Sequence, residues 1–489
     1  MKRNFKFLFM LVMIVVSMIF SSFSVFAEDE TKDEFEWVGV DGGSLNYDSS
    51  KIAEDPDAVV YKDDLYVIFQ ERNGSEKYQM RVKKYNGSKW VGVDNGSLNY
   101  NTSKSAGYSS ATVYNNELYV TWSEPNKSNI NQIRAKKYDG SKWVEVGNES
   151  LNYDSSKYAN HSSLTVYNDE LYVTFYENNR SENQIRVKKY NGSKWIMVDD
   201  GSLNYNYSKS AYNPNLEVCN DELYATWKED SNRGSIAQIR VKKYDGSKWI
   251  GIDNGSLNYD SSEYSYEPNV IAYNNELYVI WYELNASNIH QIRAKKYDGS
   301  KWIKVGDGSL NYDSSKNANQ LSSTVYNDEL YVTWHEEHEN DKCHIRVKKY
   351  NGNKWVGIDN ESLNYDSSKG AYDPSTIVYN NELYVTWVEA NGNNAADIRM
   401  KKLANKNTEP EKPSNKGNKA LLRIIMEEGT EKEYDMTMKE VNDFIDWYNK
   451  ISTTCYTIEK DYNIGPFESR QDYIVRDKIV SFEVMEYTK

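Results

Sequence analysis

One tryptophan recurs along most of this chain at a nearly fixed interval, and that interval constrains the fold more than any other feature. The copies lie 52 to 54 residues apart, at Trp37, Trp90, Trp143, Trp195, Trp249, Trp302 and Trp355. Each belongs to a repeated segment whose clearest copy is residues 114–143. A repeat of this length that is rich in Val, Tyr, Ile, Trp and Thr is typical of stacked β-strand units.

Each copy divides into four short strands. In the second copy we expect them near residues 110–114, 118–124, 132–138 and 142–146. Tight turns join the first strand to the second and the third to the fourth, since Asn and Gly tolerate positive φ. Four antiparallel strands in each of seven units predict an all-β fold, a seven-bladed β-propeller over residues 35–403.

The two ends of the array indicate how the ring closes. The last copy has a third strand near residues 397–402 but no fourth, whereas residues 35–40 form a fourth strand without the other three. We expect the N-terminal strand to complete the seventh blade, which leaves no unpaired strand edge.

The first residues are typical of a signal peptide, which we place at 1–27. Lys2, Arg3 and Lys6 precede an apolar run, and Ala27 precedes an acidic stretch. An uncleaved membrane anchor is the alternative, because the run is nearly long enough to span a bilayer. We therefore expect a secreted, extracellular protein, either released or held non-covalently at the cell surface.

After the propeller, residues 404–419 are polar and read as a linker. Residues 420–489 show no repeat and predict a small α+β domain. Strands are expected at 421–426, 432–436, 455–460 and 479–487, and a helix begins at Thr437 with Glu440 as its capping box. The apolar face of that helix consists of Val441, Phe444, Ile445 and Tyr448.

Charge and cysteine content exclude several function classes. A net charge of −14 and a pI near 5.1 argue against nucleic acids and anionic membrane surfaces as partners. Cys219, Cys343 and Cys455 are too few and too scattered for a disulfide framework. We expect a monomer without a cofactor.

A tyrosine in the connection between blades is the first candidate for ligand contact. The copies are Tyr47, Tyr100, Tyr153, Tyr205, Tyr259, Tyr312 and Tyr365. Tyrosine suits stacking on sugar rings or packing on a protein partner. The structural alternative is that Leu and Tyr of this segment fill the gap between neighbouring blades, since a feature present in every unit is most simply explained by packing.

Charged residues recur as strictly. Each second strand ends in a glutamate, and each third strand holds an arginine. The pairs are Glu71 and Arg81, Glu124 and Arg134, Glu177 and Arg186, Glu229 and Arg240, Glu283 and Arg293, Glu336 and Arg346, Glu389 and Arg399. We expect structural ion pairs within each hairpin, because seven equivalent carboxylates do not supply the asymmetry that acid–base catalysis requires.

One blade departs from the pattern with a histidine-rich stretch. His335, His338, Cys343 and His344 are metal ligands by type, but their spacing matches no standard site. A polar, solvated loop is the other interpretation, and we expect no bound metal.

The blade segments, with their Leu-Tyr-Val-Thr-Trp and Ile-Arg strands, resemble the kelch-like and sialidase-like propellers over residues 35–403. The turn at 138–143 looks like a shortened form of the Asp box of sialidase-like proteins. That family's arginine triad and Tyr-Glu nucleophile are not found as distinguishable single residues. The C-terminal region is similar to a small domain that ends many secreted clostridial and other Firmicutes proteins, which supports an extracellular location.

Three function classes follow. The first is a non-catalytic module that presents a propeller face to extracellular or cell-wall carbohydrate or to a surface protein. The second is a sialidase-like glycoside hydrolase or a polysaccharide lyase, which needs one pair of perturbed carboxylates in the central depression. The third is a structural component of the cell envelope. Fold alone does not choose among them.

Overall fold

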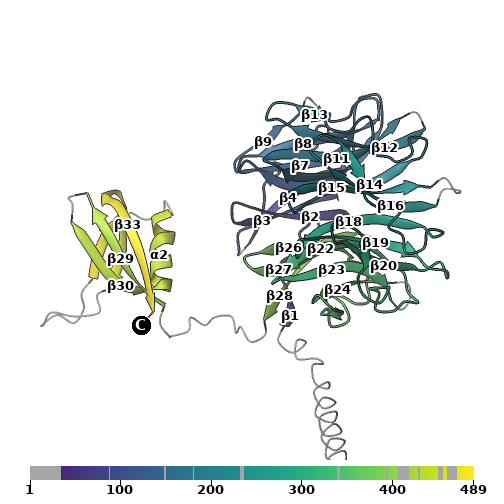
Figure 1. The fold of residues 1–489 in the computed structure, drawn as a ribbon. Coiled ribbons are helices and arrows are strands. Elements are labelled where there is room, and N and C mark those ends of the chain that lie inside the picture. The colour runs from purple at the N-terminus through teal and green to yellow at the C-terminus, as the bar shows by residue number, and fades with distance from the viewer. Residues whose placement is uncertain are drawn as a thin grey trace, which may run out of the picture. The chain divides into compact units, whose positions relative to one another are not determined.

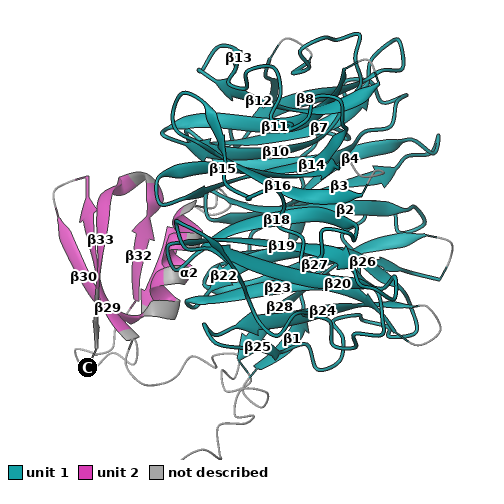
Figure 2. Ribbon diagram, turned by 45° about the vertical axis from the view of Figure 1, so that its right-hand side comes forward, with its two compact units in different colours: residues 1–405 teal, residues 406–489 magenta. Residues whose placement is uncertain are grey.

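The chain forms two compact units, residues 1–405 and 406–489, each described here by itself (Figure 2). The computed structural model describes residues 35–87, 89–147, 150–179, 181–231, 236–338, 342–392, 395–405, 418–427, 430–449, 455–459 and 471–488. The signal peptide expected at 1–27 and most of the expected linker lie outside these residues.

The first unit is a β-propeller of seven four-stranded antiparallel sheets (Figure 1). The innermost strands are β2 (Ala53–Tyr61), β6 (Gly107–Tyr114), β10 (Ala159–Tyr167), β14 (Ala211–Cys219), β18 (Ser265–Tyr273), β22 (Ala318–Tyr326) and β26 (Ala371–Tyr379). The second strands are β3 (Asp64–Arg72), β7 (Glu117–Pro125), β11 (Glu170–Asn179), β15 (Glu222–Asp230), β19 (Glu276–Leu284), β23 (Glu329–Glu337) and β27 (Glu382–Ala390). We number the blades 1 to 7 in the order of their innermost strands.

Two further strands complete each blade. The third strands are β4 (Tyr78–Tyr85), β8 (Asn131–Tyr138), β12 (Glu182–Tyr190), β16 (Ala237–Tyr244), β20 (His290–Tyr297), β24 (Cys343–Tyr350) and β28 (Ala396–Asn405). The outermost strands are β5 (Trp90–Gly92), β9 (Trp143–Glu145), β13 (Trp195–Met197), β17 (Trp249–Gly251), β21 (Trp302–Lys304), β25 (Trp355–Gly357) and, for blade 7, β1 (Phe35–Gly39).

The predicted closure of the ring is confirmed. Strand β1 pairs with β28 in antiparallel register, with Trp37 opposite Leu403, and so becomes the fourth strand of blade 7. Each innermost strand also contacts the next one, and β26 of blade 7 contacts β2 of blade 1. The ring therefore closes through the first residues of the propeller.

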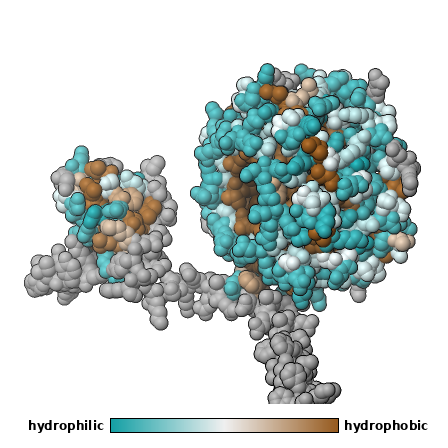
Figure 3. All heavy atoms as spheres, in the orientation of Figure 1, coloured by the Kyte–Doolittle hydropathy of each residue, from teal (hydrophilic) through white to brown (hydrophobic). Residues whose placement is uncertain are grey.

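Hydrophobic cores fill the spaces between neighbouring blades. Between blades 1 and 2, Ile68, Met80 and Val82 of one blade pack against Leu118 and Trp122 of the other. The repeated tryptophan of the outermost strand also joins neighbours: Trp90 Nε1 donates a hydrogen bond of 2.8 Å to the carbonyl of Val40 in the preceding blade. On the face drawn in Figure 3, hydrophobic residues lie in narrow seams between hydrophilic strips.

The second unit packs one helix against a three-stranded sheet. The sheet has the order β30 (Glu431–Thr437), β29 (Asn418–Met426) and β33 (Ile479–Thr488), and the helix is α2 (Met438–Asn449). The expected capping box forms, because Glu440 accepts a 2.8 Å hydrogen bond from the Thr437 N–H. A separate hairpin, β31 (Cys455–Glu459) and β32 (Gln471–Val475), contains one strand that the sequence pattern did not indicate, and η2 (Arg476–Lys478) precedes β33.

The predicted apolar face of α2 is buried as expected, with Val441 and Phe444 fully inside the core of this unit and Ile445 and Tyr448 partly so. Trp447 joins them. Over the ranges that the structure describes, every helix is too short or too polar to cross a bilayer.

Candidate functional site at the propeller axis

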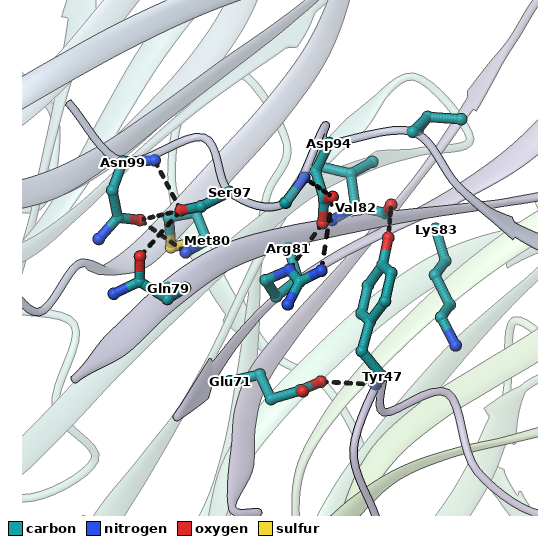
Figure 4. A network of polar contacts seen from close by, with 12 residues as sticks. Tyr47, Glu71, Gln79, Met80, Arg81, Val82, Lys83, Asp94, Ser97 and Asn99 are labelled. Carbon is teal, nitrogen blue, oxygen red and sulfur yellow. Dashed lines mark hydrogen bonds and ion pairs between the residues drawn. The ribbon is translucent and has the colours of Figure 1, made fainter. Parts of the chain in front are cut away.

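The repeated connection between blades is a clasp that binds both of its neighbours. In the first copy, the Leu45 N–H donates to the Ile398 carbonyl of blade 7 at 2.9 Å, and Asn46 Oδ1 accepts from the Ile398 N–H at 2.8 Å. The next residue turns to blade 1, where the Tyr47 N–H donates to Glu71 Oε2 at 2.7 Å (Figure 4). We call this segment, together with the glutamate that it binds, the connector clasp.

The repeated tyrosines belong to this clasp. The Tyr47 hydroxyl donates to the Val82 carbonyl at 2.8 Å, and the guanidinium of Arg81 and the ammonium of Lys83 lie 3.6 Å and 4.7 Å from the ring centroid. The other six rings also lie beside an arginine and a lysine of the third strand. Tyr47 keeps 38% of its surface exposed. Each ring is thus held by its own blade while part of it faces outward.

The second-strand glutamates are buried and act as backbone caps. Glu124 is fully buried and accepts from the Tyr100 N–H at 2.9 Å, the Asn101 N–H at 2.7 Å and the Trp122 indole at 3.0 Å. Its equivalents Glu71, Glu177, Glu229, Glu283, Glu336 and Glu389 also accept the N–H of the connector tyrosine. A carboxylate used in this way secures the turn of the clasp.

The prediction that each arginine pairs with the glutamate of its hairpin is wrong, because the arginine binds a different residue. Within the hairpin, Arg134 stands opposite Trp122, and Glu124 stands opposite Gln132. In five blades the arginine binds an aspartate that follows the outermost strand. These pairs are Arg81–Asp94 (2.7 Å), Arg186–Asp199 (3.5 Å), Arg240–Asp253 (2.8 Å), Arg346–Asp359 (2.8 Å) and Arg399–Asp41 (2.7 Å). Blades 2 and 5 have Gly147 and Gly306 there instead, and Arg293 donates to the Gly308 carbonyl. The glutamate is unavailable because the clasp backbone already occupies it.

The four candidate metal ligands of blade 6 do not come together. His335 and Cys343 lie on one face of the hairpin and His344 on the other, because His335 stands opposite Ile345 and Glu336 opposite His344. The ring of His338 stacks on His344 at 4.4 Å, and His335 meets Tyr372 edge-on. Across the described residues, no group of three or more His, Cys, Asp or Glu could hold a metal ion.

Sequence reasoning missed a ring of side chains at the start of the innermost strands. Each innermost strand shifts register against its neighbour within its first residues, as between Glu54 and Asp57, which is a β-bulge. One residue per bulge has left-handed backbone, with φ between 44° and 56°. The seven are Asp55, Tyr108, His161, Asn213, Glu267, Gln320 and Asp373. We call them the bulge ring.

The seven residues of the bulge ring adopt left-handed backbone, and none of them is glycine, the residue that adopts it most easily. Left-handed backbone costs most residues about 1 kcal/mol, and Gly, Asn and Asp tolerate it best. Four of the seven residues are not of the tolerant types, namely Tyr108, His161, Glu267 and Gln320. The seven copies are nearly identical around the connector clasp, yet the ring contains six different residue types. A bulge aims a side chain away from the regular pleat, and bulges are frequent beside functional sites. The identity of these side chains therefore matters more than the cost of their backbone.

All seven bulge residues line one cavity on the propeller axis, with a volume of about 700 Å³. The innermost strands of all seven blades contribute to its wall. Because each bulge directly follows a connection between blades, the ring lies at the loop-bearing end of the cavity. Below it, side chains tie neighbouring strands together: Asp57 Oδ2 accepts from the Ala111 N–H at 3.0 Å, and Ser110 Oγ accepts from the Leu164 N–H at 3.0 Å.

Several carboxyl groups of the cavity have pKa values raised into the neutral pH range. Burial, followed by repulsion from Asp55 and other carboxylates, raises the pKa of Asp373 to about 8. Burial and repulsion from Glu54 and Glu267 raise the pKa of Asp55 to about 7. Burial alone raises the pKa of Glu217, deeper in the wall, to about 7. Near neutral pH these groups can therefore donate as well as accept hydrogen bonds.

An aromatic wall occupies the side formed by blades 2 and 3. The ring of Tyr108 stacks on His161 with centroids 4.1 Å apart, and His161 stacks on Tyr176 at 5.6 Å. Tyr108 is 45% exposed, so its outer surface is open. Burial lowers the pKa of His161 to about 4, which leaves a neutral imidazole at physiological pH.

Blades 4 and 5 place the one lysine of this region beside two tyrosines. The ammonium of Lys228 lies 4.7 Å from the ring centroid of Tyr212 and 5.2 Å from that of Tyr266. Burial lowers its pKa, and Asp230 and Glu267 oppose that change. The neighbourhood of the cavity is thus acidic on one side, aromatic on another and basic at Lys228.

A signal for this ring does exist in the sequence. When the seven copies are aligned on their tryptophans, the position of Asp55 changes in almost every copy, whereas the connector segment before it and the second strand after it repeat. A position at which the residue type varies among internal repeats is one where packing between blades does not require a particular residue. The alignment cannot show that a bulge turns these positions toward the axis.

Known structures share the fold of the propeller. An ulvan lyase of polysaccharide lyase family PL25 superposes with a TM-score of 0.50 at 8% identity, over 75% of this chain and 95% of that one. The GH93 α-L-arabinofuranosidase of Fusarium graminearum, solved with arabinobiose, gives 0.41 at 12% identity, over 61% and 92%. Trypanosoma rangeli sialidase, solved with the inhibitor DANA, gives 0.44 at 10% identity, over 72% of this chain and 55% of the sialidase.

No family model and no curated protein matches the sequence. At 8% identity the comparison with the ulvan lyase shows a shared propeller fold and nothing about the ligand of this chain.

Proposed function

We propose that this is a secreted carbohydrate-binding protein with one ligand site per chain, located in the axial cavity. The observation that carries the proposal is the bulge ring: seven copies that agree around the clasp differ at the bulge, whose side chains line the cavity. A ring of different side chains is suited to one asymmetric ligand.

Chemistry favours a saccharide as that ligand. Tyr108 offers a half-exposed aromatic face, which suits the apolar face of a pyranose ring. Asn213, Gln320 and the carboxyls of Asp55 and Asp373 supply donors and acceptors for hydroxyl groups. The propeller neighbours include enzymes whose names refer to polysaccharide or sugar substrates, and this agrees with a glycan ligand.

The test is binding of residues 28–489 to a glycan array and to Gram-positive cell walls, with analysis of the same samples for cleaved products. Retention of glycan without cleavage, lost in Tyr108→Ala, would support the proposal. The matched control is Tyr207→Ala, which removes a 61% exposed tyrosine outside the cavity wall and should bind normally. Equal binding by both variants would contradict an axial site.

A glycosidase or lyase is the second candidate, because the cavity holds carboxyl groups in unequal surroundings. Burial raises the pKa of both Asp373 and Asp55, and a carboxyl that stays protonated near neutral pH can serve as a general acid. Release of shorter saccharides, abolished in Asp373→Asn, would replace the binding proposal by this one. An envelope component or a binder of a surface protein would retain no glycan in the same assay.

A further inference from the structure

Asp55 and Asp373 form an acidic pair on the axis. They occupy equivalent bulges of blades 1 and 7, whose innermost strands are in contact. Asp55 accepts a hydrogen bond from the Tyr108 N–H, and Asp373 accepts one from Gln320, so both donors are neutral. Throughout the described part of the chain, no lysine or arginine forms an ion pair with either group.

The remaining charges around this pair do not neutralise it. Glu54 and Glu267 repel both carboxylates. The Tyr108 hydroxyl also interacts with both, and the Tyr282 hydroxyl interacts with Asp373. The nearby cations interact with other carboxylates. Arg72 attracts Glu54, and Lys228 attracts Glu267. Because burial and mutual repulsion raise the pKa of both carboxyl groups, the pair is partly protonated near neutral pH, and a bound cation stabilises its ionised form.

A second observation is an unsatisfied polar atom in the same cavity wall. His161 lines the same cavity, and its Nδ1 is shielded from solvent and has no hydrogen-bond partner among the described residues. A buried polar atom without a partner costs free energy until a ligand or water completes its bonding. Tyr108 stacks on this imidazole and also faces the acidic pair. The wall thus offers an aromatic platform and an unpartnered polar atom near the acidic pair.

The required cation is organic rather than metallic. The described residues hold no group of three or more His, Cys, Asp or Glu that could bind a metal ion. A cavity of about 700 Å³ is also large enough for a sugar ring with its substituents. We propose, on the basis of the carbohydrate site above, that the axial cavity selects saccharides that carry a free, protonated amino group. The ammonium binds between Asp55 and Asp373, and the sugar ring stacks on Tyr108.

The test compares three oligosaccharides of equal length by calorimetric titration of residues 28–489. The probes are tetrameric β-1,4-glucosamine, its fully N-acetylated form and the corresponding glucose tetramer. We expect the free amine to bind about tenfold more tightly than either neutral probe, the effect of one well-placed charge pair. Asp373→Asn should remove that preference, whereas Asp260→Asn, which changes an exposed connector aspartate outside the cavity wall, should keep it.

The outcomes separate this inference from the function on which it rests. Equal affinities for the three tetramers, with binding still lost in Tyr108→Ala, would overturn amine selection and leave the carbohydrate site in place. Absence of binding to every saccharide would overturn both. Tetralysine that binds as tightly as the glucosamine tetramer would show that the site recognises cationic peptides instead. Should Asp373→Asn fail to fold, Asp55→Asn provides the same test from the other carboxyl.

Discussion

The connector clasp and the bulge ring lie within a few residues of each other in every blade, yet they follow opposite rules. Tyr47 of the clasp has the same kind of surroundings in all seven copies, whereas Asp55, eight positions later, corresponds to six different residue types around the ring. The clasp binds backbone of one blade to backbone of the next. The ring turns its side chains into a cavity. In this propeller, positions with the same residue in every repeat hold neighbouring blades together. Positions at which the residue differs line the cavity, where each blade contributes a different side chain.

Removing a clasp carboxylate should have the largest effect on stability. Glu124→Ala leaves two backbone N–H groups and the Trp122 indole without their acceptor in a buried place, and we expect a loss of about 3 kcal/mol in unfolding free energy. Calorimetry measures this directly. The control is Asp139→Ala, which removes a carboxylate that also accepts backbone N–H groups but lies in an exposed turn, and should cost less. Equal losses of unfolding free energy in the two variants would show that burial of the clasp carboxylate adds nothing to its contribution.

The arginines should differ between blades, although they look alike in the sequence. Arg81→Ala leaves Asp94, which is only 4% exposed, without its cation, and we expect a loss of about 2 kcal/mol, the contribution of a hydrogen bond to a charged group. In blade 2 the aspartate is replaced by Gly147, so Arg134→Ala should destabilise the propeller less. Chemical denaturation of the two variants compares them. A larger loss from Arg134→Ala would contradict the assignment of aspartate as the structural partner.

The bulge ring should make stability depend on pH in a direction opposite to that of an ordinary salt bridge. The folded pKa of Asp373 is about 8, above its ordinary value, so the folded state keeps a proton that the unfolded state loses. This stabilisation is complete below pH about 4 and is lost as the pH rises through 8. We expect the melting temperature to fall between pH 5 and pH 8, and to fall less in Asp373→Asn.

Asp55 and Glu217, whose pKa values are raised to about 7, should preserve part of that fall in the variant. Asp139→Asn is the control, because hydrogen bonds from Lys142 and Ser141 lower the pKa of Asp139 to about 2, outside this range. A flat profile in the wild type would contradict the protonated cavity.

The smallest effect should come from a clasp tyrosine. Tyr47→Phe removes one hydroxyl that donates to the Val82 carbonyl, and we expect a loss of about 1 kcal/mol with unchanged glycan retention. Thermal unfolding and the cell-wall assay can be run on the same sample. Weaker retention would return the connector tyrosines to the list of ligand contacts and favour several equivalent sites.

Much of the scaffold was predictable because it depends on local periodicity. The interval between tryptophans, the Asn-Asn turns and the incomplete last copy were enough for the blade number and for closure by residues 35–40. The partner of Arg81 was not, because Asp94 lies thirteen residues away across the outer hairpin and Glu71 looked equally close. Residue 55 and its equivalents fell just outside the predicted first strands, as Tyr108 does before 110–114. Only the register shift at the bulge directs them to the axis.

The most direct test of this account is the number and place of saccharide sites on one chain. Calorimetric titration with a glycan retained in the array gives the stoichiometry, and the same titration of Tyr108→Ala and Tyr47→Phe gives the place. We predict one site, lost in Tyr108→Ala and kept in Tyr47→Phe. A stoichiometry near seven, reduced by Tyr47→Phe and indifferent to Tyr108→Ala, would show that the repeated clasp carries the function.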